Sequence, residues 1–134
     1  MTSSPSVGDI IVHKEFPAIS RHRLALYCGA SGDHNPIHVD IDFAKAAGFP
    51  DVFAHGMLVM GYLGQALTDA VAPSRIRSFS TRFAAITQLG AQLTCEGTVT
   101  ELNEQGGEKR AKLALTTKDQ NGEIKLAGQA IIAL

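Results

Sequence analysis

One segment constrains the fold more than any other: the run from Gly56 to Ala72. It is apolar on nearly every face, carries no charge before Asp69, and is long enough for about four helical turns. A helix that is apolar all round is buried inside a protein. We therefore expect a buried helix over residues 56–72, in which Gly61 and Gly64 would let a sheet approach closely.

Four long segments after this helix alternate between apolar and polar residues, as strands do: 75–84, 92–102, 108–118 and 123–134. The turn signals Gln105-Gly106-Gly107 and Asn121-Gly122 separate the last three segments and suit antiparallel hairpins. One face of such a sheet needs an apolar partner, and only the 56–72 helix has enough apolar surface. The predicted fold is α+β, with a long antiparallel sheet curled around one buried helix.

The N-terminal half reads as a short strand followed by two helices. Residues 10–13 form a candidate strand, Ser20 can cap a helix at 21–30, and a short helix is expected from Asp40 to Gly48. A chain of 134 residues is sufficient for one substantial core. We expect one domain covering residues 1–134.

The composition argues against several classes of protein. Twelve basic and thirteen acidic residues give a formal net charge of −1, with no basic tract for nucleic acid. Cys28 and Cys95 follow no metal-ligand spacing and are too few for a disulfide framework. No run approaches the ~20 apolar residues of a membrane span, and the first residues lack a signal-peptide pattern. We expect a cytoplasmic protein that binds neither nucleic acid nor membranes.

Titratable and turn-forming residues are densest in the segment from Ser31 to His38, between two predicted helices. Asp33 and His38 flank a proline turn, so both side chains can converge on one water molecule and either can take its proton. The sequence leaves open which one does so. Asp-x-Asn-Pro also suits a plain Asx turn. A zinc site at His34 and His38 is disfavoured, because Pro36 lies between them and no third ligand follows a recognisable spacing.

A second candidate feature, His55-Gly56-Met57, lies where the apolar helix begins. The first amides of a helix have no intrahelical acceptor, and the helix dipole is positive there. The Gly56 amide therefore suits an oxygen that becomes negative during a reaction, such as a thioester carbonyl. Alternatively, Gly56 only gives the chain room to enter the helix, and His55 is an ordinary core histidine.

The residues from Tyr27 to His38, followed by Ala44, resemble the hydratase 2 motif of the MaoC-like family, and His55-Gly-Met-Leu58 matches that family as well. The spacing between the two blocks is similar to that of single-domain (R)-specific enoyl-CoA hydratases. This resemblance implies a hot-dog fold and a dimer whose sheets join edge to edge, with active sites near the interface. It also implies reversible syn hydration of a trans-2-enoyl thioester to the (R)-3-hydroxyacyl thioester, without a cofactor or metal.

Carried over by position, the resemblance implies that Asp33 and His38 hold the water and that the Gly56 amide binds the thioester carbonyl. Asn35 would support the catalytic loop; the expected substrate-binding residues are Ser31, Asn35, His55 and Met57. Some (R)-hydratases carry a serine further along the central helix, where this chain has Gly64, so that contribution is not expected here.

The sequence leaves alternatives open for the oligomeric partner, for the acyl carrier and for the function. The chain is especially similar to catalytic subunits of actinobacterial (3R)-hydroxyacyl-ACP dehydratases, which leaves a homodimer or a heterodimer open, and either CoA or acyl carrier protein as the carrier. A hot-dog acyl thioesterase and a non-catalytic thioester-binding subunit are the competing functions. Retention of both Asp33 and His38 argues for the hydratase of fatty-acid metabolism.

Overall fold

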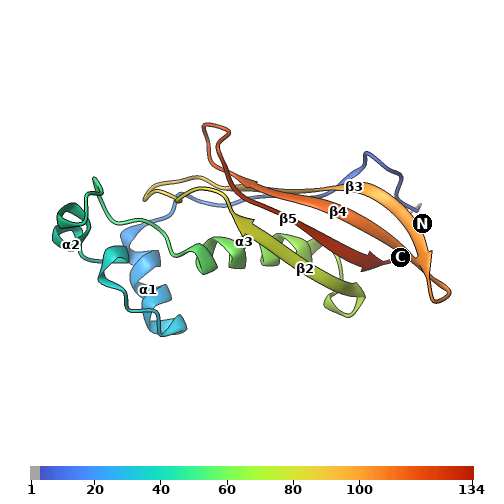
Figure 1. Cartoon of the computed structure of the whole chain (residues 1–134), viewed down its shortest axis with the longest axis horizontal. Coiled ribbons are helices and arrows are strands. Elements are labelled where there is room, and N and C mark those ends of the chain that lie inside the picture. Colours follow the sequence, from blue (N-terminus) through green and yellow to red (C-terminus); the bar gives the residue numbers. More distant parts are fainter. Residues whose placement is uncertain (1–3) are drawn as a thin grey trace.

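A five-stranded antiparallel sheet wraps one face of a central helix. The computed structural model describes residues 4–134, and the sheet order is β1-β3-β4-β5-β2. Figure 1 shows α3 lying along the sheet, with α1 and α2 together at one end of the molecule. The helices are α1 (Arg21–Ser31), α2 (Ile41–Ala46) and α3 (Gly56–Ala70); the strands are β1 (Ile10–Glu15), β2 (Ile76–Phe83), β3 (Thr94–Gln105), β4 (Glu108–Lys118) and β5 (Ile124–Ala133). The predicted α+β architecture is confirmed.

The core lies between α3 and the concave face of the sheet. Leu58, Val59, Leu63, Ala66 and Leu67 are the buried residues of α3. They belong to one apolar cluster with strand residues that include Leu113, Leu115, Leu126 and Ile132. Full burial of each Val, Leu or Ile side chain in this cluster contributes about 1.5–3 kcal/mol. The opposite side of α3 is open: Gly61 and Met57 are exposed. The helix is therefore buried on its sheet side only, and not on every face as its composition suggested.

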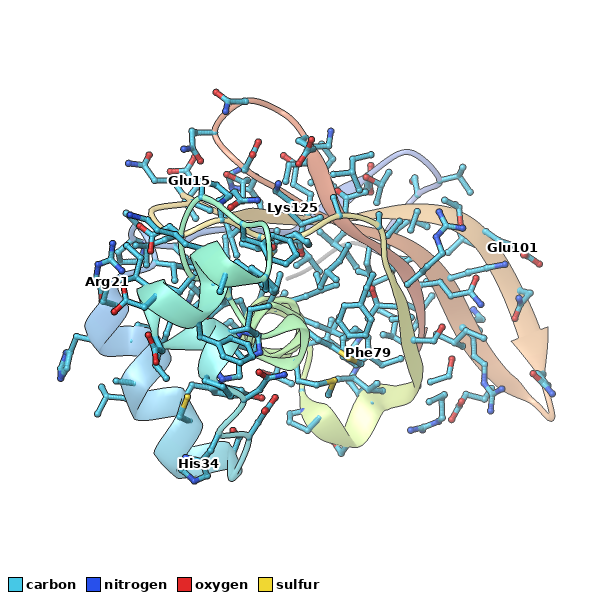
Figure 2. The ribbon with its side chains drawn as sticks, turned by 60° about the vertical axis from the view of Figure 1, so that its left-hand side comes forward. Glu15, Arg21, His34, Phe79, Glu101 and Lys125 are labelled. Atoms are coloured by element: carbon cyan, nitrogen blue, oxygen red, sulfur yellow. The ribbon has the colours of Figure 1, made fainter. Side chains whose placement is uncertain are left out.

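The two glycines inside α3 differ in their surroundings. A β-carbon at Gly64 would lie 3.6 Å from the ring of Phe79, which Figure 2 shows between β2 and α3. Gly61 has nothing within 4 Å, so the expectation that it admits the sheet was wrong. The tightest approach occurs at Gly128 in β5, where a β-carbon would collide with the backbone of Ser80 in β2.

The helix and turn boundaries follow local chemistry. The Ser20 hydroxyl accepts from the Arg23 amide at 3.0 Å, and the Asp40 carboxylate caps α2. The central helix ends at Ala70, two residues earlier than predicted, because Pro73 disfavours helical backbone at the residue before it. Within residues 4–134, no helix is both long and apolar enough to cross a membrane.

Candidate active site

The loop after α1 is held by its own polar groups. Gly32 ends the helix in the left-handed conformation, and its amide donates to the Cys28 carbonyl at 3.0 Å. The Ser31 hydroxyl donates to the Tyr27 carbonyl at 2.6 Å and accepts from the Asp33 amide at 3.1 Å. The hydroxyl of Ser31 thus stabilises the loop, and these contacts do not direct it towards a substrate.

Two successive Asx turns follow. Asp33 Oδ1 accepts from the Asn35 amide at 3.2 Å, and Asn35 Oδ1 accepts from the Ile37 amide at 3.1 Å, which caps the short helical turn η1 (Pro36–His38). The turn interpretation and the catalytic interpretation are therefore compatible, since this turn uses only one oxygen of the Asp33 carboxylate. Asn35 lies where it can support the loop, as the family resemblance implied.

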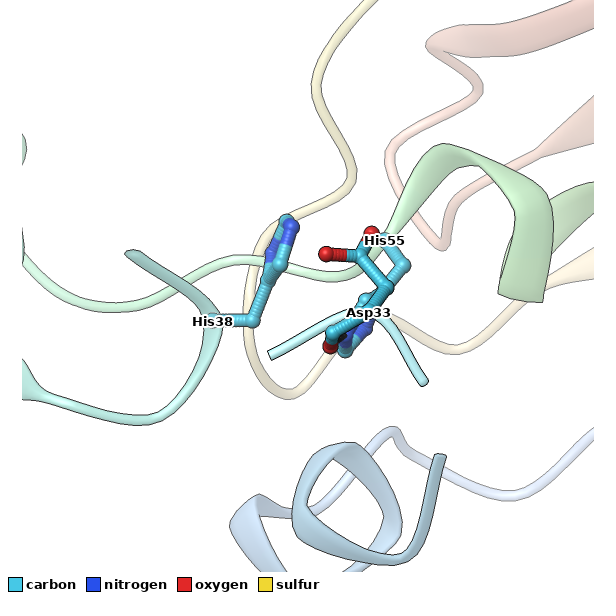
Figure 3. Close-up of side chains that lie close together, drawn as sticks. All are labelled: Asp33, His38 and His55. Carbon is cyan, nitrogen blue, oxygen red and sulfur yellow. Dashed lines mark hydrogen bonds between the residues drawn. The ribbon is translucent and has the colours of Figure 1, made fainter. Parts of the chain in front are cut away.

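Three side chains from different segments converge beside the start of α3 (Figure 3). A carboxylate oxygen of Asp33 and one ring nitrogen each of His38 and His55 all lie within 4.8 Å of one another. Asp33 is exposed, whereas His38 and His55 are 8% and 1% exposed. Two hydrogen bonds to a shared water span up to about 5.6 Å. One water molecule can therefore contact Asp33 and His38 together.

The tautomer of the neutral His38 ring follows from its partner. Nδ1 of His38 lies 2.8 Å from the carbonyl oxygen of Phe53, which can only accept a hydrogen bond. The proton of the neutral ring therefore resides on Nδ1, and Nε2 presents its lone pair. The Phe53 ring meets the His38 ring edge-on, with centroids 5.4 Å apart. Backbone and aromatic contacts with Phe53 thus fix the orientation of the His38 ring.

His55 is buried among the groups that form the site. Its Nε2 lies 3.3 Å from the Asp33 carbonyl and 3.4 Å from Cys28 Sγ, and its ring stacks on that of His38. Burial lowers the pKa of His55 and the adjacent His38 lowers it further, against the opposing influence of Asp33. His55 is therefore neutral at pH 7. Its side chain contacts Asp33 and His38, and its predicted substrate-binding role stays a prediction.

The geometry of Asp33, His38 and His55 does not suit a metal ion. The two histidine rings stack with planes 25° from parallel, so their in-plane lone pairs lie in two nearly parallel, separate planes. A tetrahedral metal requires ligand lone pairs that converge on one point. Nδ1 of His38 and Nε2 of His55 are also engaged by backbone carbonyls. His34, the other half of the zinc alternative, is exposed and lies outside this group.

Gly56 is the first residue of α3 and borders an apolar cavity of about 290 Å³. The first intrahelical donors are the amides of Leu58 and Val59, which both bond to the His55 carbonyl. The amide of Gly56 precedes them and has no intrahelical acceptor. The cavity is also lined by Phe53, Ala54, Val59, Leu126 and residues 83–87. Met57, a predicted substrate-binding residue, is 57% exposed and does not line this cavity.

Sequence reasoning missed Phe83 and Phe53. Two ring carbons of Phe83 lie 3.0 and 3.1 Å from the position that a β-carbon on Gly56 would occupy. A signal for Phe83 existed: Phe79 and Phe83 share one face of β2, and they meet Gly64 and Gly56 of α3. No signal existed for Phe53, because it engages His38 through a backbone carbonyl that any residue could supply.

The sheet around α3 defines a hot-dog protein, with an acid–imidazole pair beside the N-terminus of that helix. The model of the family described as "MaoC like domain" matches residues 6–121. The chain belongs to the MaoC-like family.

Relatives of known name agree with this assignment. The (R)-specific enoyl-CoA hydratase of Rhodospirillum rubrum is 34% identical over 116 residues, covering 85% of this chain and 78% of that protein. The peroxisomal enoyl-CoA hydratase 2 of Arabidopsis thaliana is 37% identical over 75 residues, which are 54% of this chain. That match spans only 24% of the Arabidopsis protein. The match to enoyl-CoA hydratase ChsH3 of Mycobacterium tuberculosis spans 26% of the ChsH3 protein.

Solved structures share the whole fold. The (R)-hydratase of A. caviae involved in PHA biosynthesis matches with a TM-score of 0.82 at 25% identity, covering 99% of both chains. R-hydratase PhaJ1 of Pseudomonas aeruginosa matches with a TM-score of 0.80 at 28% identity, covering 96% of this chain and 82% of that one.

Proposed function

We propose that this protein is an (R)-specific enoyl-thioester hydratase, and in the reverse direction a (3R)-hydroxyacyl-thioester dehydratase. The observation that carries the proposal is that a carboxylate oxygen of Asp33 and a ring nitrogen of His38 lie within 4.8 Å of each other, a separation that one water molecule can bridge, beside the first amide of α3. The matching (R)-specific hydratase of Rhodospirillum rubrum supports the same reaction.

The substrate has a defined place in this proposal. Its acyl chain occupies the apolar cavity and its thioester carbonyl accepts a hydrogen bond from the Gly56 amide. Water held by Asp33 and His38 attacks the β-carbon, and the carbon–carbon π electrons move towards the carbonyl to give an enolate. Asp33 or His38 takes the proton that the water loses, and this pair then returns a proton to the α-carbon on the same face. The Gly56 amide stabilises the negative oxygen in between.

The proposal extends to the partners of the chain. The substrate is an acyl-CoA or acyl carrier protein thioester of fatty-acid metabolism. The protein forms a homodimer, with a heterodimer as the alternative. β2 is an edge strand of the sheet and carries Phe83 at the cavity, so pairing along an edge would both protect the strand and cover the site. The cytoplasmic location stays a prediction.

A spectrophotometric assay tests the proposed function. Purified protein is mixed with crotonyl-CoA, and the enoyl absorbance and free CoA are followed together. Loss of the enoyl absorbance without release of CoA is the expected result. Release of CoA would indicate a thioesterase instead, and a flat trace without CoA would indicate a binding subunit. Asp33→Asn serves as the control, because it keeps the shape of the side chain and removes its charge.

A further inference from the structure

One wall of the cavity has no regular secondary structure. Residues 84–87 follow β2 and line the same cavity as Gly56. On the side of the active site, the Ala54 amide donates to the Thr87 carbonyl at 2.9 Å, and Phe53 forms an isolated bridge with Gln88. This side of the wall is therefore tied to the segment that also holds His38.

Lys125 holds the other side of the wall. Its ammonium group donates to the Ile86 carbonyl at 2.8 Å, and its own carbonyl accepts from the amides of Ala84 and Ala85 at 2.9 and 3.4 Å. Lys125 is only 2% exposed, although it lies at the start of β5 near the turn from β4 (Figure 2). One residue thus fixes three consecutive residues of the wall.

The buried ammonium group has two acidic partners. It pairs with Asp119 at 3.5 Å and with Glu123, both from the turn between β4 and β5. Burial raises the pKa of Asp119, but amide donors from Glu123 and Asn121, with the charge of Lys125, outweigh it and lower the pKa. A buried charge is costly unless it is paired and hydrogen-bonded, and apolar residues often replace it at no loss. Packing alone therefore does not account for a lysine here.

We propose that Lys125 is a positioning residue that sets acyl-chain specificity by fixing the wall at residues 84–87. The inference rests on the proposed function, because it takes the cavity to be the acyl site. A short acyl chain can lie against Gly56 and Val59, whereas a longer chain must fill the cavity and contact the wall. Only the longer chain then depends on the wall keeping its shape, because pocket contacts set discrimination between homologous substrates.

The test compares Lys125→Met with Lys118→Met, a matched change at an exposed lysine of β4. For Lys125→Met, KM for 2-octenoyl-CoA should rise about tenfold, the scale of losing a hydrogen bond from a charged donor. KM for crotonyl-CoA should rise less than about twofold on the same scale. The value of kcat and its pH profile should not change. The separate variant Lys125→Arg keeps a charged donor and should therefore retain the wild-type KM for 2-octenoyl-CoA.

Hydrogen exchange supplies a readout that does not depend on activity. Lys125→Met keeps the backbone carbonyl that accepts from Ala84 and Ala85 but loses the ammonium group that holds Ile86. The wall should therefore loosen, and the amides of Ala84 and Ala85 should exchange at least about tenfold faster, while those of α3 keep their protection. If the exchange becomes faster but the wild-type protein shows no hydration activity, the proposed function is wrong, although Lys125 still anchors the wall. Unchanged exchange, or equal effects on both substrates, would overturn the inference. Global unfolding of Lys125→Met and Lys125→Gln, with Lys118→Met folded, would overturn it too, because Lys125 would then hold the whole domain.

Discussion

The imidazole ring of His55 stacks on that of His38, with ring centroids 3.8 Å apart and planes 25° from parallel. Nε2 of the same His55 ring contacts the carbonyl oxygen of Asp33 at 3.3 Å, and a carbonyl only accepts, so this nitrogen donates. One buried, neutral side chain therefore contacts both residues that are proposed to hold the water. His55 fixes their separation without itself facing the cavity.

Asp33→Asn and His38→Gln should each lower turnover by at least ~100-fold, since a general acid–base group contributes ~10²–10⁴. Because both groups act on one water, the double variant should be little worse than the poorer single variant. Initial rates of crotonyl-CoA hydration, with circular dichroism to verify folding, measure the effect. Additive losses would show that the two residues serve separate steps, and near-normal rates would remove the proposed mechanism.

The buried His55 should make stability depend on pH. Its pKa lies below the ordinary 6.5, so the folded protein resists a proton that the unfolded chain accepts. The contribution of neutral His55 to the free energy of unfolding is therefore complete above pH 6.5 and declines as the pH falls below 6.5.

Urea unfolding at pH 7.5 and 5.5 tests this dependence. The wild type should lose more stability between the two values than His55→Gln, because glutamine does not titrate. His22→Gln, at an exposed position of α1, is the matched control and should behave as the wild type does. An equal decline in His55→Gln and the wild type would mean that His55 is not the group responsible.

Gly56→Pro should remove the amide proposed to bind the carbonyl while the helix still forms, since proline is tolerated at a first helical position. Loss of one such donor costs ~10²–10³ in turnover. Circular dichroism and crotonyl-CoA hydration measure folding and activity separately. A folded Gly56→Pro protein with near-wild-type turnover would place the carbonyl elsewhere.

Gly56→Ala keeps the amide and should cost less than Gly56→Pro. Its methyl group would lie 3.0 Å from a ring carbon of Phe83, which is tight, but Phe83 is 52% exposed and has room to move. We expect a loss within about tenfold, less than the loss of an oxyanion donor. The double variant Gly56→Ala/Phe83→Ala should regain part of it. A further loss in the double variant would show that the Phe83 ring contributes binding that outweighs the crowding.

The product should be the (R)-3-hydroxyacyl thioester, as the family resemblance implies. Chiral chromatography of the hydrolysed 3-hydroxy acid decides the matter. The S enantiomer would contradict the assignment of the reaction, although not of the fold.

A dimer should form in solution, because an unpaired β2 leaves an open sheet edge. Light scattering should give about twice the 14.2 kDa mass of one chain at micromolar concentration. A species of 14.2 kDa alone would contradict this expectation.

Local chemistry made much of the fold predictable. The Ser20 and Asp40 caps, and the positive φ of Gly106, Gly107 and Gly122, fall where the sequence placed helix starts and turns. The candidate Asp33 and His38 also converge as expected, since only a proline turn separates them. Elements whose signals lie within a few residues of one another can be predicted in this way.

Contacts between distant segments could not be predicted from such signals. Cys28 meets His55 across 27 positions, and Lys125 reaches Ile86 across 39. The second contact ends on a backbone carbonyl, which leaves no trace in residue type. The exposed side of α3 was also not predicted. Apolar composition indicates that a helix is covered, but it does not indicate which element covers each face.

The hydrogen bond from His38 Nδ1 to the Phe53 carbonyl closes one side of the imidazole to proton traffic. A carbonyl oxygen is far too weak a base to carry a proton away, so the ring cannot act as a relay to the solvent. Any proton that arrives at Nε2 has to leave from Nε2. Where His38 is the base, both directions of the proposed reaction therefore use Nε2, and a hydrogen taken from the water can return to the substrate before it exchanges with the surroundings.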